Sequence, residues 1–179
     1  MKNLITLLLV LAVVATWYFA PPPETRQHTA ENPTDYFIVD FDRKKMDTQG
    51  KVASTFHASR VDHYPGQQIA KLQQPRAITY NEGNPPWFLR ADQGVRDERN
   101  NRITLQGDVV ANQRYRDQEK FSLIETEQLN LFLDEDYLIT DQPIRITTES
   151  SFTQSIGAKA WMDRGIVQLL RNAAGHYQP

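Results

Sequence analysis

Residues 86–113 read PWFLRADQGVRDERNNRITLQGDVVANQ, and this stretch decides the fold class. It contains two runs rich in Val, Ile, Leu, Thr and aromatic residues, WFLRAD (87–92) and RITLQGDVVANQ (102–113). The polar turn at residues 97–100 lies between them. Short runs of this composition, separated by turn-forming residues, are typical of β-strands. The stretch therefore predicts an all-β architecture.

The same pattern continues on both sides of this stretch, from Tyr36 to the end of the chain. No segment in this region shows the apolar stripe of a helix, and Leu129, Leu131 and Leu133 alternate at the period of a strand. The pattern predicts an all-β sandwich or solenoid. The other expected strands are VASTFHAS (52–59), PRAITY (75–80), KFSLIETE (120–127), QLNLFL (128–133), YLIT (137–140), PIRITT (143–148) and GIVQLL (165–170).

A weak internal repeat is visible in the strand region. Four small or hydroxyl-bearing residues recur at similar places, and three of them are followed by a Pro or Gly at an expected corner. The recurring residues are Ala58, Ala91, Thr126 and Ala158, and the corner residues are Pro75, Gly107 and Pro143. Repeated units that stack would bury one continuous interior, with no unit stable alone. Ordinary hairpin spacing in a sandwich is the alternative.

The N-terminal segment differs from the rest of the chain. No charged residue occurs from Leu4 to Ala20, a length of roughly 25 Å as a helix, which is within the range of a membrane span. We expect a retained transmembrane anchor at residues 1–20, since bulky Tyr18 and the prolines after Ala20 make a poor signal-peptide cleavage site. Lys2 favours a cytoplasmic N-terminus. Residues 21–34 are expected to form a Pro-rich linker, and residues 35–179 a β domain outside the cytoplasm.

Composition excludes several classes of function. The net charge is −2, so no basic excess indicates a nucleic-acid partner. The chain has no cysteine, which excludes disulfides and thiolate metal sites. His57 and His63 would lie about 20 Å apart along one strand, too far to share a metal. No nucleophile elbow or Gly-rich loop is present. We therefore expect a protein without enzymatic activity, metal or cofactor; a β-solenoid carbohydrate enzyme is a remote alternative.

The order of these segments resembles the LptC family, the periplasmic bridge subunit of the lipopolysaccharide export system. The resemblance covers the anchor, the linker and the strand region. It is carried by PWFLRAD (86–92) followed by ITLQGDV (103–109), ETEQL (125–129), the corner QPI (142–144), GAKA (157–160) and a last strand ending at Tyr177. One departure is the Ser150-Ser151-Phe152 segment, where the family often has a glycine. No role is transferred to that segment.

The resemblance implies a twisted, open β-jellyroll of stacked antiparallel strands. It also implies a non-enzymatic component of the lipopolysaccharide export ABC transporter complex of the inner membrane. Such a component receives lipopolysaccharide in an apolar groove and passes it to a soluble periplasmic β-jellyroll bridge protein. The implied partners are lipopolysaccharide, the transporter's membrane subunits and that bridge protein. A membrane-anchored envelope scaffold that binds only proteins, through β-edge pairing around a sealed core, is the alternative.

Ten apolar side chains are expected to face the interior and contact lipid. They are Phe56, Leu72, Ile78, Trp87, Leu89, Leu105, Phe121, Leu131, Phe152 and Trp161. Ile156 is also expected to face inward, and the resemblance implies a ligand contact for Leu72. Each of these residues could instead belong to an ordinary core, because a sandwich needs apolar side chains in any case.

Five residues are expected to contact protein partners: Gly50, Val52, Ile166, Val167 and Leu169. The strands at Tyr36–Phe41 and Val52–Phe56 are expected to pair with the transporter, and the C-terminal strand with the soluble bridge protein. Gly50 matches a family glycine, but could be a simple turn residue with positive φ. The basic residues 43–45 could lie in a solvated turn or contact glycolipid phosphates.

Overall fold

The computed structural model describes residues 34–80, 83–115, 120–133, 137–161 and 166–177, which form strands and turns without a helix. Residues 32–179 belong to one compact unit. The strands are β1 (Tyr36–Met46), β2 (Val52–Tyr64), β3 (Ile69–Gln73), β4 (Arg76–Thr79), β5 (Trp87–Arg90), β6 (Gln93–Asp97), β7 (Arg102–Arg114), β8 (Phe121–Phe132), β9 (Tyr137–Thr148), β10 (Ser151–Trp161) and β11 (Ile166–Tyr177). The predicted all-β class is confirmed.

The expected anchor and nearly all of the expected linker lie outside the described residues, so both stay predictions. In the described part of the chain, no helix is long and apolar enough to cross a membrane.

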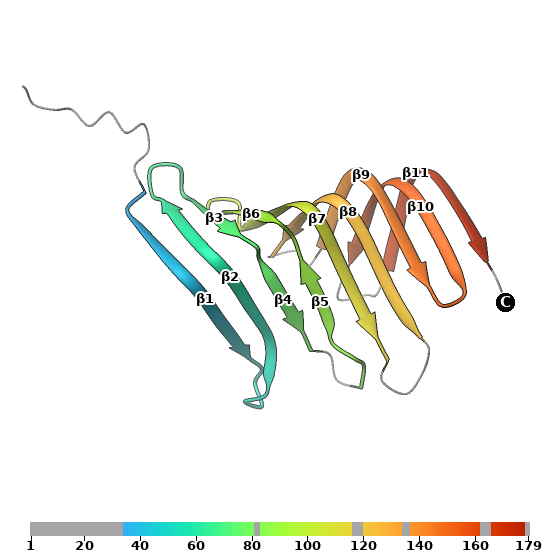
Figure 1. Cartoon of the computed structure of the whole chain (residues 1–179), viewed down its shortest axis with the longest axis horizontal. Coiled ribbons are helices and arrows are strands. Elements are labelled where there is room, and N and C mark those ends of the chain that lie inside the picture. Colours follow the sequence, from blue (N-terminus) through green and yellow to red (C-terminus); the bar gives the residue numbers. More distant parts are fainter. Residues whose placement is uncertain (1–33, 81–82, 116–119, 134–136, 162–165, 178–179) are drawn as a thin grey trace, which may run out of the picture. The chain divides into compact units, whose positions relative to one another are not determined.

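β7 to β11 form an antiparallel meander in which consecutive strands pair, and β1 pairs with β2 at the other end of the sheet (Figure 1). β3 and β4 both pair with β2, and β5 and β6 both pair with β7, so each of these pairs acts as two halves of one long strand. β1 lies outside β2, and β11 lies outside β10. The described sheet therefore has two outer strands, β1 and β11.

A line of irregularities crosses the long strands near their middles. The pairing register shifts between Gln106 and Val109, between Thr126 and Asn130, and between Ile156 and Ala158. Bulges of this kind bend a strand and increase its twist. The bend divides the sheet into two half-sheets, one containing β4 and β5 and the other containing β3 and β6.

The predicted corner residues occupy this line. Pro75 lies between β3 and β4, Gly107 has φ +75° at the β7 bulge, and Pro143 adjoins the β9–β10 shift. The four repeat residues Ala58, Ala91, Thr126 and Ala158 are all buried beside it. Thr126 donates its hydroxyl hydrogen to the Pro143 carbonyl at 3.0 Å, which satisfies a backbone acceptor that the bulge frees from the ladder.

The two half-sheets pack face to face next to the corner. Phe41 and Phe56 of one half-sheet contact the buried residues Ala58, Val61, Ala70 and Leu72. Leu89 of the same half-sheet and Leu129 and Leu131 of the other all pack against the buried residues Ala91, Leu105 and Val109. The core is thus narrow and follows the corner.

The corner glycine Gly157 supports a stability prediction. Its φ is +81°, and a Cβ there would lie 3.2 Å from the Thr140 carbonyl oxygen. Gly50 has a similar φ of +78° with open space around its Cβ position. We expect Gly50→Ala to cost about 1 kcal/mol from backbone strain alone. Gly157→Ala should cost about 2–3 kcal/mol, since strain and crowding add.

Urea unfolding of the two variants measures this difference in the free energy of unfolding. If both variants lose the same free energy of unfolding, the corner relaxes around the added methyl group. Close packing at the bulge would then contribute nothing to stability.

Several strands extend further than the sequence runs suggested. KFSLIETE and QLNLFL form the single strand β8, and YLIT and PIRITT form the single strand β9. Each pair was divided in sequence by polar residues that the structure places at the corner. The runs also omitted β3, β6 and β10. The central residues of β6 and β10 include Gly, Ser and Gln and carry a weak strand signal.

Candidate functional site

One face of the folded sheet carries a continuous set of apolar side chains. Residues paired across antiparallel strands share a face, and residues two apart on a strand share it too. Starting from the core clusters, the pairings place the following residues on one face, called here the inward face: Phe41, Phe56, Leu72, Ala77, Trp87, Leu89, Ile103, Leu105, Ala111, Ile124, Leu129, Leu131, Leu138, Ile144 and Ile146.

The inward face is only partly closed. Within the described residues, the largest side chains with under 2% exposure are Val109 and Thr140, both beside the corner. No aromatic residue in this part of the chain is buried, and Phe56, Trp87 and Leu89 are half-buried. A sandwich sealed on all sides would bury such side chains, because their large apolar area drives core formation. The space between the half-sheets therefore leaves apolar surface available.

Six of the ten expected lipid-contact residues lie on the inward face: Phe56, Leu72, Trp87, Leu89, Leu105 and Leu131. Leu72 and Leu105 are the most buried of them, at 6% and 4% exposure. Both flank Gly94, where an added Cβ would come within 3.2 Å of each side chain. This close approach makes the corner end of the interior tight.

The inward orientation is wrong for the other four candidates, Ile78, Phe121, Phe152 and Trp161, and also for Ile156. Ile78 pairs with Thr55 and Phe88, and Phe88 is 43% exposed. Phe152 is 37% exposed, with the Arg145 guanidinium over its ring. Trp161 pairs with Tyr137, and the Lys159 ammonium lies over both rings. The physical reason is that successive side chains of a strand point to opposite faces of the sheet. Two apolar residues an odd number of positions apart on one strand therefore lie on opposite faces.

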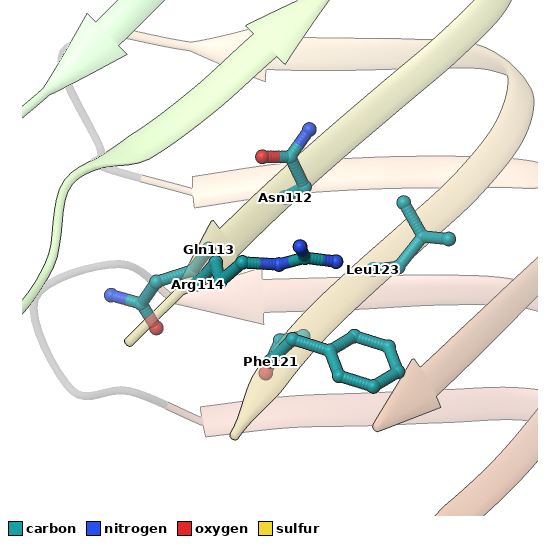
Figure 2. Close-up of a pocket in the computed structure, with 6 residues that line it drawn as sticks. Asn112, Gln113, Arg114, Phe121 and Leu123 are labelled. Carbon is teal, nitrogen blue, oxygen red and sulfur yellow. The ribbon is translucent and has the colours of Figure 1, made fainter. Parts of the chain in front are cut away.

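Phe121 lies at a shallow hollow on the end of the β7–β8 hairpin. The hollow is lined by Asn112, Gln113, Arg114, Phe121, Ser122 and Leu123. Figure 2 shows the Arg114 and Phe121 side chains extending to one side of the hairpin, and Gln113 to the other. Gln113 is buried and donates a hydrogen bond to the Pro85 carbonyl at 2.7 Å. Phe121 therefore does not line the interior.

The two outer strands expose apolar residues. On β1, Tyr36, Phe37 and Val39 are exposed, with Phe37 at 58%. On β11, Ile166, Val167 and Leu170 are exposed, and Leu169 is half-buried. Both strands are long, with 11 residues in β1 and 12 in β11. Long apolar edges with free backbone groups favour pairing with another strand.

The partner-binding candidates fall into two groups. Ile166, Val167 and Leu169 lie on the outer strand β11, as expected. The edge placement of Val52–Phe56 is wrong, because β1 pairs with β2 on one side and β4 on the other. Gly50 lies in the β1–β2 turn with positive φ, so the turn interpretation is confirmed. Contact of these residues with partners stays a prediction.

The start of β1 is held by an ionic cluster. His63 Nδ1 lies 2.7 Å from Asp35 Oδ1, and its Nε2 lies 3.7 Å from Glu98 Oε2. The Tyr36 ring stacks on the imidazole, with ring centroids 4.7 Å apart. The hydrogen bond to Asp35 is the main cause that raises the pKa of His63. The cluster ties the β1 start to β2 and to the turn after β6.

This cluster predicts a pH-dependent stability. Because the folded protein binds the His63 proton more tightly, its contribution is fully present below about pH 6.5. It is lost as the pH rises through the raised folded pKa. Thermal unfolding between pH 5 and 9 should show a decline that His63→Gln and Asp35→Asn both flatten. An unchanged pH profile in both variants would contradict the assignment.

The interior contains residues that the sequence interpretation omitted. Phe41, Ile103, Ile124 and Ile146 face inward but were not among the candidates. Phe41 shares its strand face with Arg43 and Lys45, and the Tyr36–Phe41 strand was expected to pair with the transporter rather than to line the interior. Phe41 could have been identified by first placing Ala58 inward and then pairing the two strands, because Phe41 lies directly opposite Ala58.

The apolar residues named above offer apolar contact to a ligand. The described residues contain no cluster of three or more His, Cys, Asp or Glu able to hold a metal. A few hydroxyl groups face inward near the corner, and Thr140 accepts a hydrogen bond from the Gln142 amide at 3.1 Å. The apolar side chains of this face fit an elongated apolar ligand.

Fold and face together define an open β-jellyroll with an apolar interior and two exposed strand edges. A family model described as "Lipopolysaccharide-assembly, LptC-related" matches residues 3–178. The chain belongs to this LptC-related family of lipopolysaccharide assembly. The family resemblance seen in the sequence is therefore confirmed.

The comparison with solved structures agrees on the fold. Among solved structures, the chain is similar to LptH from Pseudomonas aeruginosa, described as the LptA homologous periplasmic component of the conserved lipopolysaccharide transport device. The identity is 12% and the TM-score 0.51, over 78% of this chain and 96% of LptH. At this identity the similarity shows the fold alone. No curated protein matches the chain significantly.

Proposed function

We propose that this protein receives lipopolysaccharide at the inner membrane and passes it to a soluble periplasmic bridge protein. The observation that carries this proposal is the half-open inward face, on which Phe56, Trp87 and Leu89 stay partly exposed. Acyl chains that enter this space gain about 0.8 kcal/mol for each buried CH₂ group. Family membership supports lipopolysaccharide as the ligand.

The two sheet edges give the proposal a direction. β1 follows directly after the expected linker and anchor, so this edge would meet the transporter's membrane subunits. β11 is the outer strand at the opposite end of the meander and would pair with the soluble β-jellyroll partner. Pairing of strand edges joins two sheets through backbone hydrogen bonds, which supply affinity. The interiors of the joined proteins would then be continuous.

The proposed location follows from the same order of segments. Residues 1–20 would anchor the chain in the inner membrane and leave the β domain in the periplasm. N-terminal sequencing of the membrane-bound protein should begin at residue 1 or 2. A mature protein that starts at Pro21 would contradict the anchor.

The scaffold alternative differs in one respect, the use of the interior. Exposed edges suit both functions, since both need strand pairing. A protein-only scaffold has no need for half-buried aromatic side chains between its half-sheets. The partly exposed inward face therefore favours the lipid conduit.

Site-specific photo-crosslinking in cells tests the proposal. Leu89 and Phe88 are adjacent on β5 and face opposite sides of the sheet. A photoreactive residue at Leu89 should trap lipopolysaccharide, while the same residue at Phe88 should not. Equal labelling at both positions would reject an interior path. No labelling at Leu89, Trp87 or Leu72 would favour the scaffold.

A further inference from the structure

We propose that Arg43 and Lys45 form an anion-binding subsite on the β1 rim of the interior, where they take the phosphate groups of a lipid headgroup. The acyl chains of the same lipid would lie beside them against Phe41 and Phe56. This inference rests on the proposed lipid-binding function and adds where the polar end of the ligand is held.

The strand register places these two cations on the inward face. Arg43 pairs with Phe56, Lys45 pairs with Ser54, and Phe41 pairs with Ala58, which is fully buried. Phe41 and Phe56 contact each other edge to face, with ring centroids 6.1 Å apart. Arg43 and Lys45 therefore continue the row that starts at these rings.

The neighbouring residues Asp42 and Lys44 on β1 face the outer side of the sheet. Lys44 pairs with Thr55 on the outer face. Asp42 also faces outward, and its carboxylate lies 3.1 Å from Nδ1 of His57. The nearest acidic residue along the strand is thus turned away from Arg43 and paired elsewhere.

The residues that the structure describes do not neutralise the charge of the subsite. Among the described residues, neither Arg43 nor Lys45 makes a side-chain hydrogen bond or an ion pair. The inward side of β1, β2 and β4 carries no carboxylate, and the carboxylates of Asp35 and Glu98 contact His63 at the far end of β1. A face with cations and no acidic partner attracts an anion.

The spacing suits an amphiphile with a phosphorylated headgroup. Residues two apart on a strand are separated by roughly 7 Å, so Arg43 and Lys45 lie about 7 and 14 Å beyond Phe41. Acyl chains on the rings and phosphates on the cations can therefore belong to one molecule. Arg and Lys form strong charge-assisted hydrogen bonds with phosphate oxygens. An uncharged lipid would use only the apolar part.

Charged residues on an outer strand have another use, which is to prevent edge-to-edge aggregation. That role needs no phosphate and would not distinguish Arg43 and Lys45 from Lys44. Lys44 therefore provides a matched control of the same charge on the same strand.

The test measures binding of two probes, diphosphoryl lipid A and its fully dephosphorylated form, to the full chain in mild detergent. We expect the double variant Arg43→Gln/Lys45→Gln to bind diphosphoryl lipid A roughly tenfold more weakly, the factor that corresponds to about 1.4 kcal/mol. Its binding of the dephosphorylated probe should not change. Lys44→Gln should bind both probes like the unmodified protein, and free inorganic phosphate at millimolar concentration should not displace lipid A.

Three results would overturn the subsite. In the first, the double variant binds diphosphoryl lipid A as tightly as the unmodified protein does. In the second, Lys44→Gln loses as much affinity for diphosphoryl lipid A as the double variant does. In the third, the double variant loses as much affinity for the dephosphorylated probe as for diphosphoryl lipid A. If the unmodified protein binds neither probe, the proposed lipid function itself fails. Circular dichroism of each variant separates loss of binding from loss of folding.

Discussion

A single proline in β11 should abolish binding of the proposed soluble periplasmic partner while the domain stays folded. β11 is an outer strand, paired with β10 on one side only. Successive residues of an edge strand direct their N–H groups alternately toward the sheet and away from it. Proline has no N–H, so it removes a donor from whichever side its residue serves.

Val167→Pro and Gln168→Pro therefore form a matched pair. One of the two should remove a free donor and prevent pairing with the partner, without a change in thermal stability. The other should weaken the β10–β11 ladder and lower stability. Single side-chain changes such as Leu169→Ala should be tolerated, because edge pairing uses backbone groups.

A pull-down with the soluble partner and the membrane transporter measures the outcome. Retention of the soluble partner by both proline variants would show that β11 is not the pairing edge. Loss of both partners with a lower unfolding temperature would indicate unfolding rather than a blocked edge. Association with the transporter should survive in the variant that stays stable.

A carboxylate on the inward face should stop lipid transfer, while the same carboxylate one residue away should not. Ile124 pairs with Ala111 and Ile146 on the inward face. Its neighbour Leu123 pairs with Asn112 and Thr147 on the outer face. Both side chains are half-buried. They therefore differ mainly in the direction they face.

Ile124→Asp would place a charge in the path of the acyl chains, where an unpaired ion is costly by several kcal/mol. We expect transfer of lipopolysaccharide to the soluble partner to fall by more than about 100-fold, which corresponds to roughly 3 kcal/mol. Leu123→Asp should transfer at a rate close to that of the unmodified protein. Vesicle-based transfer assays provide the measurement.

Comparable transfer by both variants would exclude the inward face as the route. Circular dichroism and thermal unfolding control for folding, since both substitutions remove an apolar side chain. A second inward variant, Ile146→Asp, should behave like Ile124→Asp.

Some parts of the site could be predicted from local sequence, and others could not. Trp87 and Leu89 alternate with exposed Phe88 and Arg90, and period-two counting placed them inward correctly. Ile78 and Phe121 were placed inward because they are apolar, although their partners across the strands show otherwise. A one-residue change in register reverses the face of every later side chain. Each bulge at the corner shifts the register in this way. Counting every second residue along a strand therefore predicts the wrong face beyond a bulge.

The edges show a similar division. The sequence indicated that β11 comes last, but it could not show that β1 covers β2 and leaves Val52–Phe56 inside the sheet. The charged segment at residues 43–45 suggested a turn. The β1–β2 pairing instead makes it a strand in which Lys44 faces the opposite side from Arg43 and Lys45.

By itself, the sequence determined the all-β class, the turns, the corner residues and the family, because each depends on local composition or on the order of motifs along the chain. The tertiary structure alone decided which face each apolar residue occupies, which strands form the edges and how far the interior stays open. The physical reason is that these properties arise from pairings between strands and from bulges at the corner. Asp40 and Asn172, for example, take positive φ with no glycine beside them to signal the bend.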